Sequence, residues 1–293
     1  ELYEEELRVR ELQEKIKNAL AILTETQRRR VLMRFVDDLT LEEIKDRLGK
    51  GEEQTGGRTK GSIVADIFES FLAAVYLTKD FDTVKNICEG AKVASRSLAL
   101  LSGEKRNALL IKIADNLRAS ASKIIEANAL DLANAKANGI SDAMLDRLML
   151  NEARIDGIAD AIVKIASLDD PIGAGEIFTR RNGLEIHKMC VPLGVVAMIY
   201  EARPNVTPDA SSLCLKSGNA VVLRGGKEAI NSNKAIVSVI RATLLECGVD
   251  ENAVSLIEDT SRESANVLMS MRGYIDVLIP RGGKGLIKSV VER

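Results

Sequence analysis

The chain has 293 residues, of which 46% are hydrophobic and 29% are charged, so it is long enough to bury a sizeable core and to form two or more domains. Its formal net charge of -2 excludes a global electrostatic attraction to nucleic acid or to anionic membranes. The four cysteines follow no metal-binding or dense disulfide spacing, and no apolar run reaches the roughly 20 residues of a membrane span, so we expect a cytoplasmic protein without a membrane partner.

Residues 1–50 carry the pattern of consecutive helices. Thr24 and Thr40 each begin a capping-box pattern, and apolar residues recur between them at helical spacing. The segment at about 20–50 resembles the start of the helix-turn-helix in region 4 of sigma factors. The resemblance stops where the recognition helix of that family would begin, because the sequence there becomes "GKGEEQTGGRTKGS". We therefore expect an α-helical N-terminal extension with a partial helix-turn-helix.

Residues 51–80 resemble the glycine-rich loop and following helix of the ribonuclease III catalytic domain. In that family an acidic pair on this helix serves a magnesium site, and the matching positions are Asp66 and Glu69. A spacing of three residues places both carboxylates on one helix face, and oxygen ligands of this kind suit Mg²⁺. The upstream acidic signature of the family is absent from this sequence. We therefore interpret the pair as a solvent-facing feature of an amphipathic helix and predict no metal site.

From residue 81 onward the sequence predicts one α/β region. Up to Pro171 it contains no proline and is rich in Ala, Leu, Ile, Glu and Lys, which indicates consecutive helices with breaks near Ser102, Asn138 and Asn151. After Pro171, short β-branched runs alternate with helical stretches, which favours a parallel sheet covered by helices. The predicted strands are Glu185–Val191, Leu193–Tyr200, Ala220–Leu223, Ala253–Ile257 and Tyr274–Ile279.

Two of these strands run into a double glycine that opens a helix, in "AVVLRGGKEAINSN" and in "YIDVLIPRGGKGLIKS". Such turns present backbone N–H groups at the positive end of a helix dipole, and the ligand crevice of a parallel sheet lies at the carboxyl ends of its strands. Neither turn has the G-x-G-x-x-G fingerprint, so the pattern indicates either a nucleotide or phosphate site or glycines used only for tight turns. Lys227 beside the first turn favours NADP, because a cation there suits a ribose 2′-phosphate.

Residues 82–293 resemble the γ-glutamyl phosphate reductase family. The motifs that carry the resemblance are "ANALDLANAKANGISDAMLDRL", "VPLGVVAMIYEARPNVTPDASSLCLKSGNAVVLRGGKEAINSN" and "DVLIPRGGKGLIKSVVE", in the order of that family. The resemblance implies the aldehyde dehydrogenase superfamily fold, a Rossmann-type parallel sheet preceded by helices. It also implies NADPH-dependent reduction of γ-glutamyl phosphate to glutamate 5-semialdehyde in proline biosynthesis, with that acyl phosphate as the small-molecule substrate.

The resemblance also assigns residues to the site. Asn205 in "EARPNV" aligns with an amide that lies near the reacting oxygen in aldehyde dehydrogenases, although a structural turn role for this loop is the alternative. His187, the single histidine, is expected at a surface or sheet edge. The expected cofactor-binding residues are Arg224, Gly225, Gly226 and Lys227 on the adenosine side, and Gly282 and Gly283 on the pyrophosphate side.

The chemistry of this superfamily requires a cysteine thiolate as nucleophile. In the family that cysteine lies in a second domain, beyond the position that matches Arg293. The cysteines of this chain do not match its motif and are expected as small buried apolar residues. They are Cys88, Cys190, Cys214 and Cys247. We therefore expect the cofactor-binding portion only, truncated before the catalytic domain, with an exposed apolar interface that favours homo-oligomers.

The predicted organisation is a partial helix-turn-helix-like segment at 1–50, a ribonuclease-III-like fragment at 51–80 and a dinucleotide-binding region at 81–293. An alternative is a nucleic-acid-binding or RNA-processing protein that acts through residues 1–80. Another is a chimeric chain in which neither part is functional. We favour the reductase because its resemblance covers roughly 210 residues, whereas each N-terminal resemblance is short and incomplete, so nucleic acid is not the expected partner.

Overall fold

The structure is a computed structural model that describes residues 81–291. The helix-turn-helix-like segment and the pair Asp66 and Glu69 lie outside the described residues, and their interpretation stays a prediction. The chain divides into two units, Glu1–Thr83 and Val84–Arg293. Within the described part, no helix is long and apolar enough to cross a membrane.

The helices that precede the strands begin and end close to where the sequence predicts. Ser102 Oγ and Asn151 Oδ1 each accept a hydrogen bond from a backbone N–H in the first turn of the helix that follows. Gly139, at φ +70°, follows the helix that ends at Ala137. A further break at Ser120 was not predicted. In order, the elements are a helix over residues 81–98, α5 (Gly103–Ala119), α6 (Ala121–Ala137), α7 (Asp142–Leu148) and α8 (Glu152–Ser167).

The main sheet confirms the predicted parallel arrangement. Its strands, in chain order, are β3 (Val195–Tyr200), β4 (Ala220–Arg224), β5 (Val254–Leu256) and β6 (Val277–Arg281). They are joined by α9 (Val206–Lys216), the 3₁₀ turn η2 (Lys227–Ala229), α10 (Ile230–Glu246), η3 (Glu251–Ala253) and α11 (Arg262–Ser270), and α12 (Lys284–Val291) follows β6. The order across the sheet is β5-β4-β3-β6. The chain thus steps from β3 outward to β5 and then returns to place β6 on the other side of β3.

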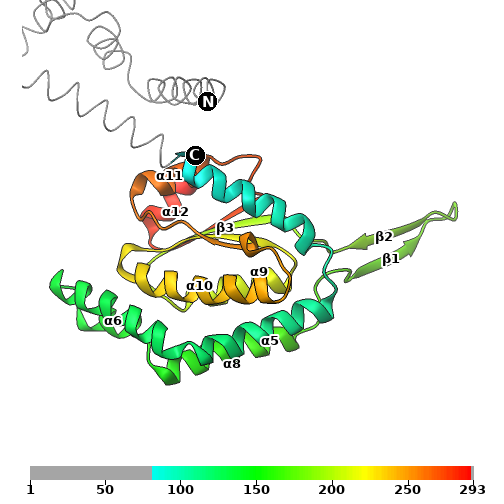
Figure 1. Ribbon diagram of the computed structural model, residues 1–293. Coiled ribbons are helices and arrows are strands. Elements are labelled where there is room, and N and C mark those ends of the chain that lie inside the picture. Colours follow the sequence, from blue (N-terminus) through cyan, green and yellow to red (C-terminus); the bar gives the residue numbers. More distant parts are fainter. Residues whose placement is uncertain (1–80, 292–293) are drawn as a thin grey trace, which may run out of the picture. The chain divides into compact units, whose positions relative to one another are not determined.

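Both faces of this sheet are covered by helices, as a parallel sheet requires (Figure 1). Along β3, Val195, Ala197 and Ile199 belong to one buried cluster, which also includes residues of the helix at 81–98 and of α11. The alternate residues Val196 and Tyr200 belong to a second cluster with α9 and α10. In Figure 1, α5 and α8 form a further layer outside α9 and α10.

A separate antiparallel hairpin extends from the body of the fold (Figure 1). Its strands are β1 (Gly175–Thr179) and β2 (Glu185–Met189). The predicted strand at 185–191 is present over Glu185–Met189, but it pairs with β1, which was not predicted, and not with the parallel sheet. The physical reason is that the two strands pair with each other across a short turn, so their apolar residues reach no helix-covered core. His187 lies on β2 with its side chain 49% exposed, which confirms the expected surface position.

A buried carboxylate of α6 fixes this helix to the start of α10. Asp131 on α6 is 2% exposed. Its Oδ2 accepts hydrogen bonds from the backbone N–H and the hydroxyl of Ser232, at 2.8 and 2.6 Å, and its Oδ1 accepts from Asn231. Because Asn231 and Ser232 lie in the first turn of α10, the carboxylate satisfies N–H groups that this helix end leaves without partners. The start of α10, and with it the turn that follows β4, is thereby held in place.

Candidate functional site

A cavity of about 890 Å³ lies where the strands of the parallel sheet end. The residues that follow β3 and β4 form its floor, and side chains of α7, α11 and α12 form its walls. The residues that line this cavity include Arg147, Tyr200, Glu201, Arg203, Arg224, Gly226, Glu228 and Arg262. This is the edge at which the sequence predicted a ligand crevice.

The charge of this cavity favours an anionic ligand. Its wall carries four arginines against two glutamates. Arg147, Arg203 and Arg262 form no ion pair with another described residue. The arginines are the positively charged side chains of this wall. Within residues 81–291, no group of three or more His, Cys, Asp or Glu residues could hold a metal ion. Guanidinium groups without partners suit phosphate oxygens.

Arg224 at the end of β4 has a partly structural role. Its Nη2 donates to the backbone oxygens of Thr260 and Ser261, at 2.5 and 2.6 Å, and so ties β4 to the loop before α11. Its Nε is buried and makes no hydrogen bond within the described residues. Arg224 therefore lines the cavity, with one donor that has no partner among the described residues, and its role in cofactor binding stays a prediction.

The first glycine turn has two different glycines. Gly225 is buried, and a Cβ there would collide with Nδ2 of Asn233 and lie 3.1 Å from the ring of Tyr200, so this glycine allows close packing. Gly226 lines the cavity itself. Lys227 begins η2 with an exposed side chain that forms no ion pair with another described residue.

The second glycine turn is occupied by a side chain that the sequence did not predict there. The backbone N–H of Gly283 donates to Oε1 of Glu201, at 2.7 Å. A Cβ on Gly282 would lie 2.8 Å from the same oxygen, so only glycine allows the carboxylate to approach this closely. Glu201 follows β3 and is 82 residues away in sequence, which leaves no local signal for the contact. A carboxylate therefore sits against the backbone that was predicted to bind pyrophosphate.

Asn205 lies next to the first cavity and not on its wall. It precedes α9, is exposed, and makes no side-chain hydrogen bond to that helix. Together with Asp209 it lines a second cavity of about 620 Å³. The two cavities share Arg147 and Arg203, so they adjoin.

The cysteines differ in environment more than the sequence predicted. Cys88 and Cys214 are buried, and burial raises the pKa of each thiol to about 12, so both are protonated at neutral pH and poor nucleophiles. The expectation of burial was wrong for Cys190 and Cys247, which are exposed. Cys190 follows the solvent-exposed β2, and Cys247 follows the last turn of α10, so neither position faces the core.

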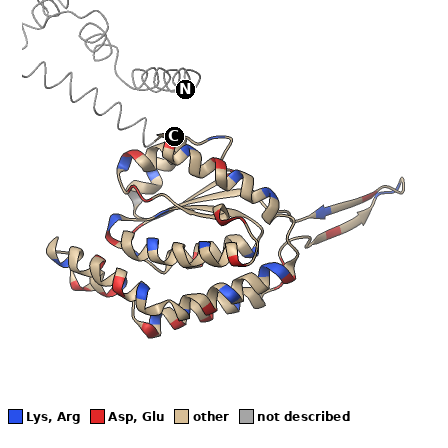
Figure 2. Ribbon diagram, viewed as in Figure 1, with Lys and Arg blue, Asp and Glu red and all other residues tan. Residues whose placement is uncertain are grey.

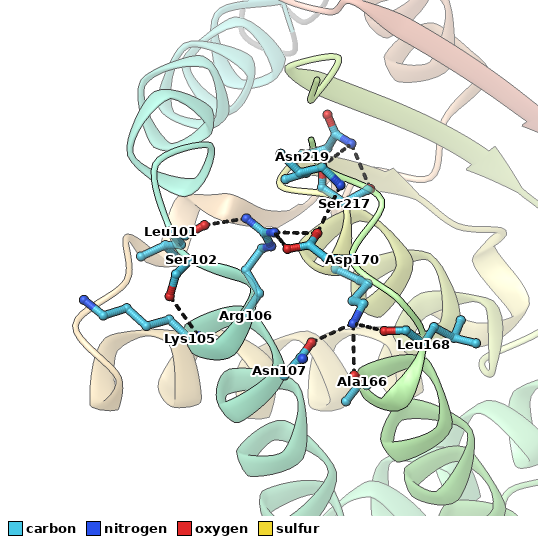
Figure 3. A network of polar contacts seen from close by, with 12 residues as sticks. Leu101, Ser102, Lys105, Arg106, Asn107, Ala166, Leu168, Asp170, Ser217 and Asn219 are labelled. Carbon is cyan, nitrogen blue, oxygen red and sulfur yellow. Dashed lines mark hydrogen bonds and ion pairs between the residues drawn. The ribbon is translucent and has the colours of Figure 1, made fainter. Parts of the chain in front are cut away.

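The opposite, amino edge of the sheet carries a polar network whose charges are satisfied internally (Figure 3). Arg106 is 2% exposed, and its Nη2 donates to both oxygens of Asp170, at 2.8 and 2.6 Å. Nζ of Lys216 donates to the side chain of Asn107, at 2.7 Å, and to two backbone oxygens at the end of α8. Each buried cation of this network has protein acceptors, although Nε of Arg106 is buried without a hydrogen-bond partner among the described residues. The network therefore joins α5, α8 and α9.

Comparison with protein families gives two matches. The sequence model of the aldehyde dehydrogenase family matches residues 70–282. The model of sigma-70 region 4 matches residues 19–55, which lie outside the described residues. The two matches occupy different parts of the chain.

Similar proteins cover the region of the first match. The γ-glutamyl phosphate reductase of Carboxydothermus hydrogenoformans is 54% identical over 212 residues, which are 72% of this chain and 51% of that protein. That of Geobacillus kaustophilus is 51% identical over 207 residues, or 70% and 50% of the two chains. The crystal structure of γ-glutamyl phosphate reductase from Thermotoga maritima superimposes with a TM-score of 0.70 at 39% identity, over 71% of this chain and 51% of that chain. The chain spans about half the length of the curated relatives it matches.

The Arg106–Asp170 pair predicts a pH-dependent stability. The backbone N–H of Ile172 and then Arg106 hold the pKa of Asp170 below its ordinary 3.8, so its stabilising contribution is complete above that pH and is lost as the pH falls through the lower, folded-state pKa. We expect Asp170→Asn to cost about 1–2 kcal/mol at pH 7, a value reduced because this carboxylate is 38% exposed. Urea unfolding of both proteins between pH 7 and pH 3 measures this difference.

The difference between the two proteins is expected to narrow below pH 3.8. A matched control is Asp115→Asn, because Asp115 is 63% exposed and pairs with Arg118 only at 3.7 Å. It is expected to change the unfolding free energy by less than about 0.5 kcal/mol. Equal stability of wild type and Asp170→Asn at pH 7 would show that the pair does not stabilise the fold.

Proposed function

This chain belongs to the aldehyde dehydrogenase family, and from that premise we propose that its residues 81–293 are the dinucleotide-binding region of a γ-glutamyl phosphate reductase. The reaction is the NADPH-dependent reduction of γ-glutamyl phosphate to glutamate 5-semialdehyde with release of phosphate, a step of proline biosynthesis. The proposal is supported by two reductases with 54% and 51% identity to this chain. We also propose a cytoplasmic location, which the four free cysteines suit.

The observation that carries the proposal is the 890 Å³ cavity at the carboxyl end of β3. Its position between the two glycine turns is where open parallel sheets bind dinucleotides. The partnerless arginines and the unsatisfied Nε of Arg224 fit a ligand that carries several phosphate oxygens. A bound nicotinamide dinucleotide supplies the hydride in this chemistry.

We assign the roles of the chain's own residues accordingly. Arg224, Gly226 and Lys227 bind the adenosine side, and Gly282 and Gly283 bind pyrophosphate through their backbone. Asn205, on the second cavity, directs its amide toward the substrate. None of the four cysteines lines either cavity, so we assign to the described residues the binding and orientation of ligands and not nucleophilic attack.

A second candidate function is DNA binding by the N-terminal part. It is supported by the match of residues 19–55 to sigma-70 region 4. A mobility-shift assay with duplex DNA at two salt concentrations measures it, because binding through phosphate contacts weakens with salt. Absence of any shift at low salt would refute this second function.

The positive charge of Lys227 beside the first glycine turn leads to a prediction of which nicotinamide dinucleotide the chain binds more tightly. We expect the chain to bind NADPH more tightly than NADH, and Lys227→Ala to weaken NADPH binding by about tenfold while it leaves NADH binding unchanged, because only NADPH carries the 2′-phosphate. Isothermal titration calorimetry with both dinucleotides measures this. The matched control is Lys188→Ala, an equal loss of charge on the distant strand β2. If neither dinucleotide binds to the folded protein, the proposed cofactor site is wrong.

The position of Glu201 leads to the prediction that removal of its negative charge increases the affinity for NADPH. Its carboxylate lies 2.7 Å from the Gly283 nitrogen, so it repels a phosphate at this turn. We expect Glu201→Gln to bind NADPH about threefold to tenfold more tightly, since the negative charge is gone and a neutral amide oxygen competes less strongly than a carboxylate for the Gly283 N–H. Glu228→Gln removes the same charge from the same cavity without this backbone contact, and a smaller effect is expected. Weaker binding by Glu201→Gln would contradict a phosphate at Gly283.

A further inference from the structure

The second cavity, of about 620 Å³, has charges of both signs that its own structure leaves without partners. On the side of the first cavity it has Arg147 and Arg203, which belong to both cavities. Neither forms an ion pair with another described residue. Further along α9 it has Asp209.

Asp209 is a partly buried carboxylate in the first turn of α9. Its side chain accepts no hydrogen bond and forms no ion pair within the described residues. Burial raises the pKa of Asp209, and the positive charge of Arg281 partly opposes this rise. Because a partly desolvated carboxylate without a partner is costly, a cationic group that enters the cavity gains an interaction that water supplies only incompletely.

The other acidic residue of the cavity differs in this respect. Asp146 is 66% exposed and pairs with Arg154 at 2.8 Å. Arg154 also donates to the backbone oxygen of Met149, at 2.8 Å, so its position is fixed. These two charges neutralise each other. Among the described residues, the cavity therefore has one unpaired carboxylate for a cation, Asp209, and two unpaired guanidinium groups for an anion, Arg147 and Arg203.

We propose that the second cavity binds the amino-acid end of the substrate, with Asp209 as the residue that selects for an α-ammonium group. Arg147 and Arg203 bind the acidic group at the other end of the same ligand. Because these arginines also face the first cavity, that acidic end lies toward the dinucleotide. The ligand class is a short α-amino acid with a second acidic group, or its acyl phosphate. This inference rests on the proposed function and adds a specificity determinant to it.

The test compares three ligands that differ by one charged group. L-glutamate has the ammonium and both acids, glutarate lacks the ammonium, and γ-aminobutyrate lacks the α-carboxylate. Titrations of the 293-residue chain followed by ¹H–¹⁵N NMR give the dissociation constant of each. We expect L-glutamate to bind about fivefold to tenfold more tightly than glutarate, and Asp209→Asn to reduce that ratio to near one.

Three further variants separate this role from a general effect of charge. Asp146→Asn removes an equal charge from the same cavity and is expected to keep the wild-type ratio, since Asp146 is already paired. Arg203→Gln is expected to weaken L-glutamate and glutarate by similar factors. Far-UV circular dichroism of Asp209→Asn checks that the variant is folded. The conservative change Asp209→Glu keeps the carboxylate and is expected to keep most of the ratio.

The outcomes distinguish this inference from the proposed cofactor. If NADPH binds and the wild-type ratio is one, or if Asp209→Asn keeps the ratio, the amino-acid site is wrong and the dinucleotide site stands. If the ratio is present and lost in Asp209→Asn while NADPH does not bind, the amino-acid site is supported and the cofactor proposal fails.

Discussion

The central position of β3 is the constraint on which the rest of the structure depends. β3 pairs in parallel with β4 on one side and with β6 on the other, so the three strands end at one edge. Since both faces of the sheet are covered by helices, a ligand can approach these strands only where they begin or end. The connection from β3 leads away to β4 and β5, and the chain returns across the sheet to form β6. The crevice between the two glycine turns follows from this reversal of direction.

The charged side chains at the two edges of the sheet differ in whether they have partners within the protein. At the amino edge, Asp276 Oδ2 accepts from the backbone N–H of Val195 at 2.8 Å and from Lys92 Nζ at 2.7 Å, which closes the start of β3. The neighbouring N–H of Gly194 donates to Asn219 Oδ1 at 2.9 Å. In Figure 2, residues of both charges are spread over the helices of the described region. The difference is in the ion pairs: at the amino edge Arg106 pairs with Asp170, whereas Arg147, Arg203 and Arg262 at the carboxyl edge form no ion pair with another described residue. A buried Nε without a hydrogen-bond partner among the described residues occurs at both edges, in Arg106 and in Arg224.

Local signals in the sequence were sufficient for the helix boundaries other than the break at Ser120, and for the parallel strands. Ser102 and Asn151 were identified as breaks because a side-chain oxygen at that position satisfies N–H groups only a few residues away. Gly218, at φ +72°, ends α9 as its sequence indicates. The hairpin of β1 and β2 was not identified correctly, because periodicity does not show whether a strand pairs with a covered sheet or with a neighbour in solvent. The prediction that Cys190 is buried was wrong for the same reason, because this small apolar residue lies beside the hairpin.

Contacts between distant residues account for the part of the site that the sequence did not predict. The glycines of the two turns are visible as a motif, but the partner of Gly283 is Glu201, which is 82 residues away. The partner of Ser232 is Asp131, at a distance of 101 residues. Neither pair has a periodicity or a spacing that a single sequence reveals, because the fold brings the residues together. The motif therefore identifies the region, and the long-range contacts decide which backbone groups are available.

Two carboxylates on this edge, eight residues apart in sequence, show why its selectivity depends on hydrogen bonding more than on net charge. Glu201 is held by a backbone N–H, which satisfies it and places a negative charge where a phosphate would bind. Asp209 has no such donor within the described residues, and burial raises its pKa. A satisfied carboxylate competes with anions for the donor it occupies, whereas an unsatisfied one gains most from a cation. We therefore expect the same chemical group to limit anion binding in one cavity and to favour cation binding in the next, because among the described residues the backbone supplies a donor to only one of them.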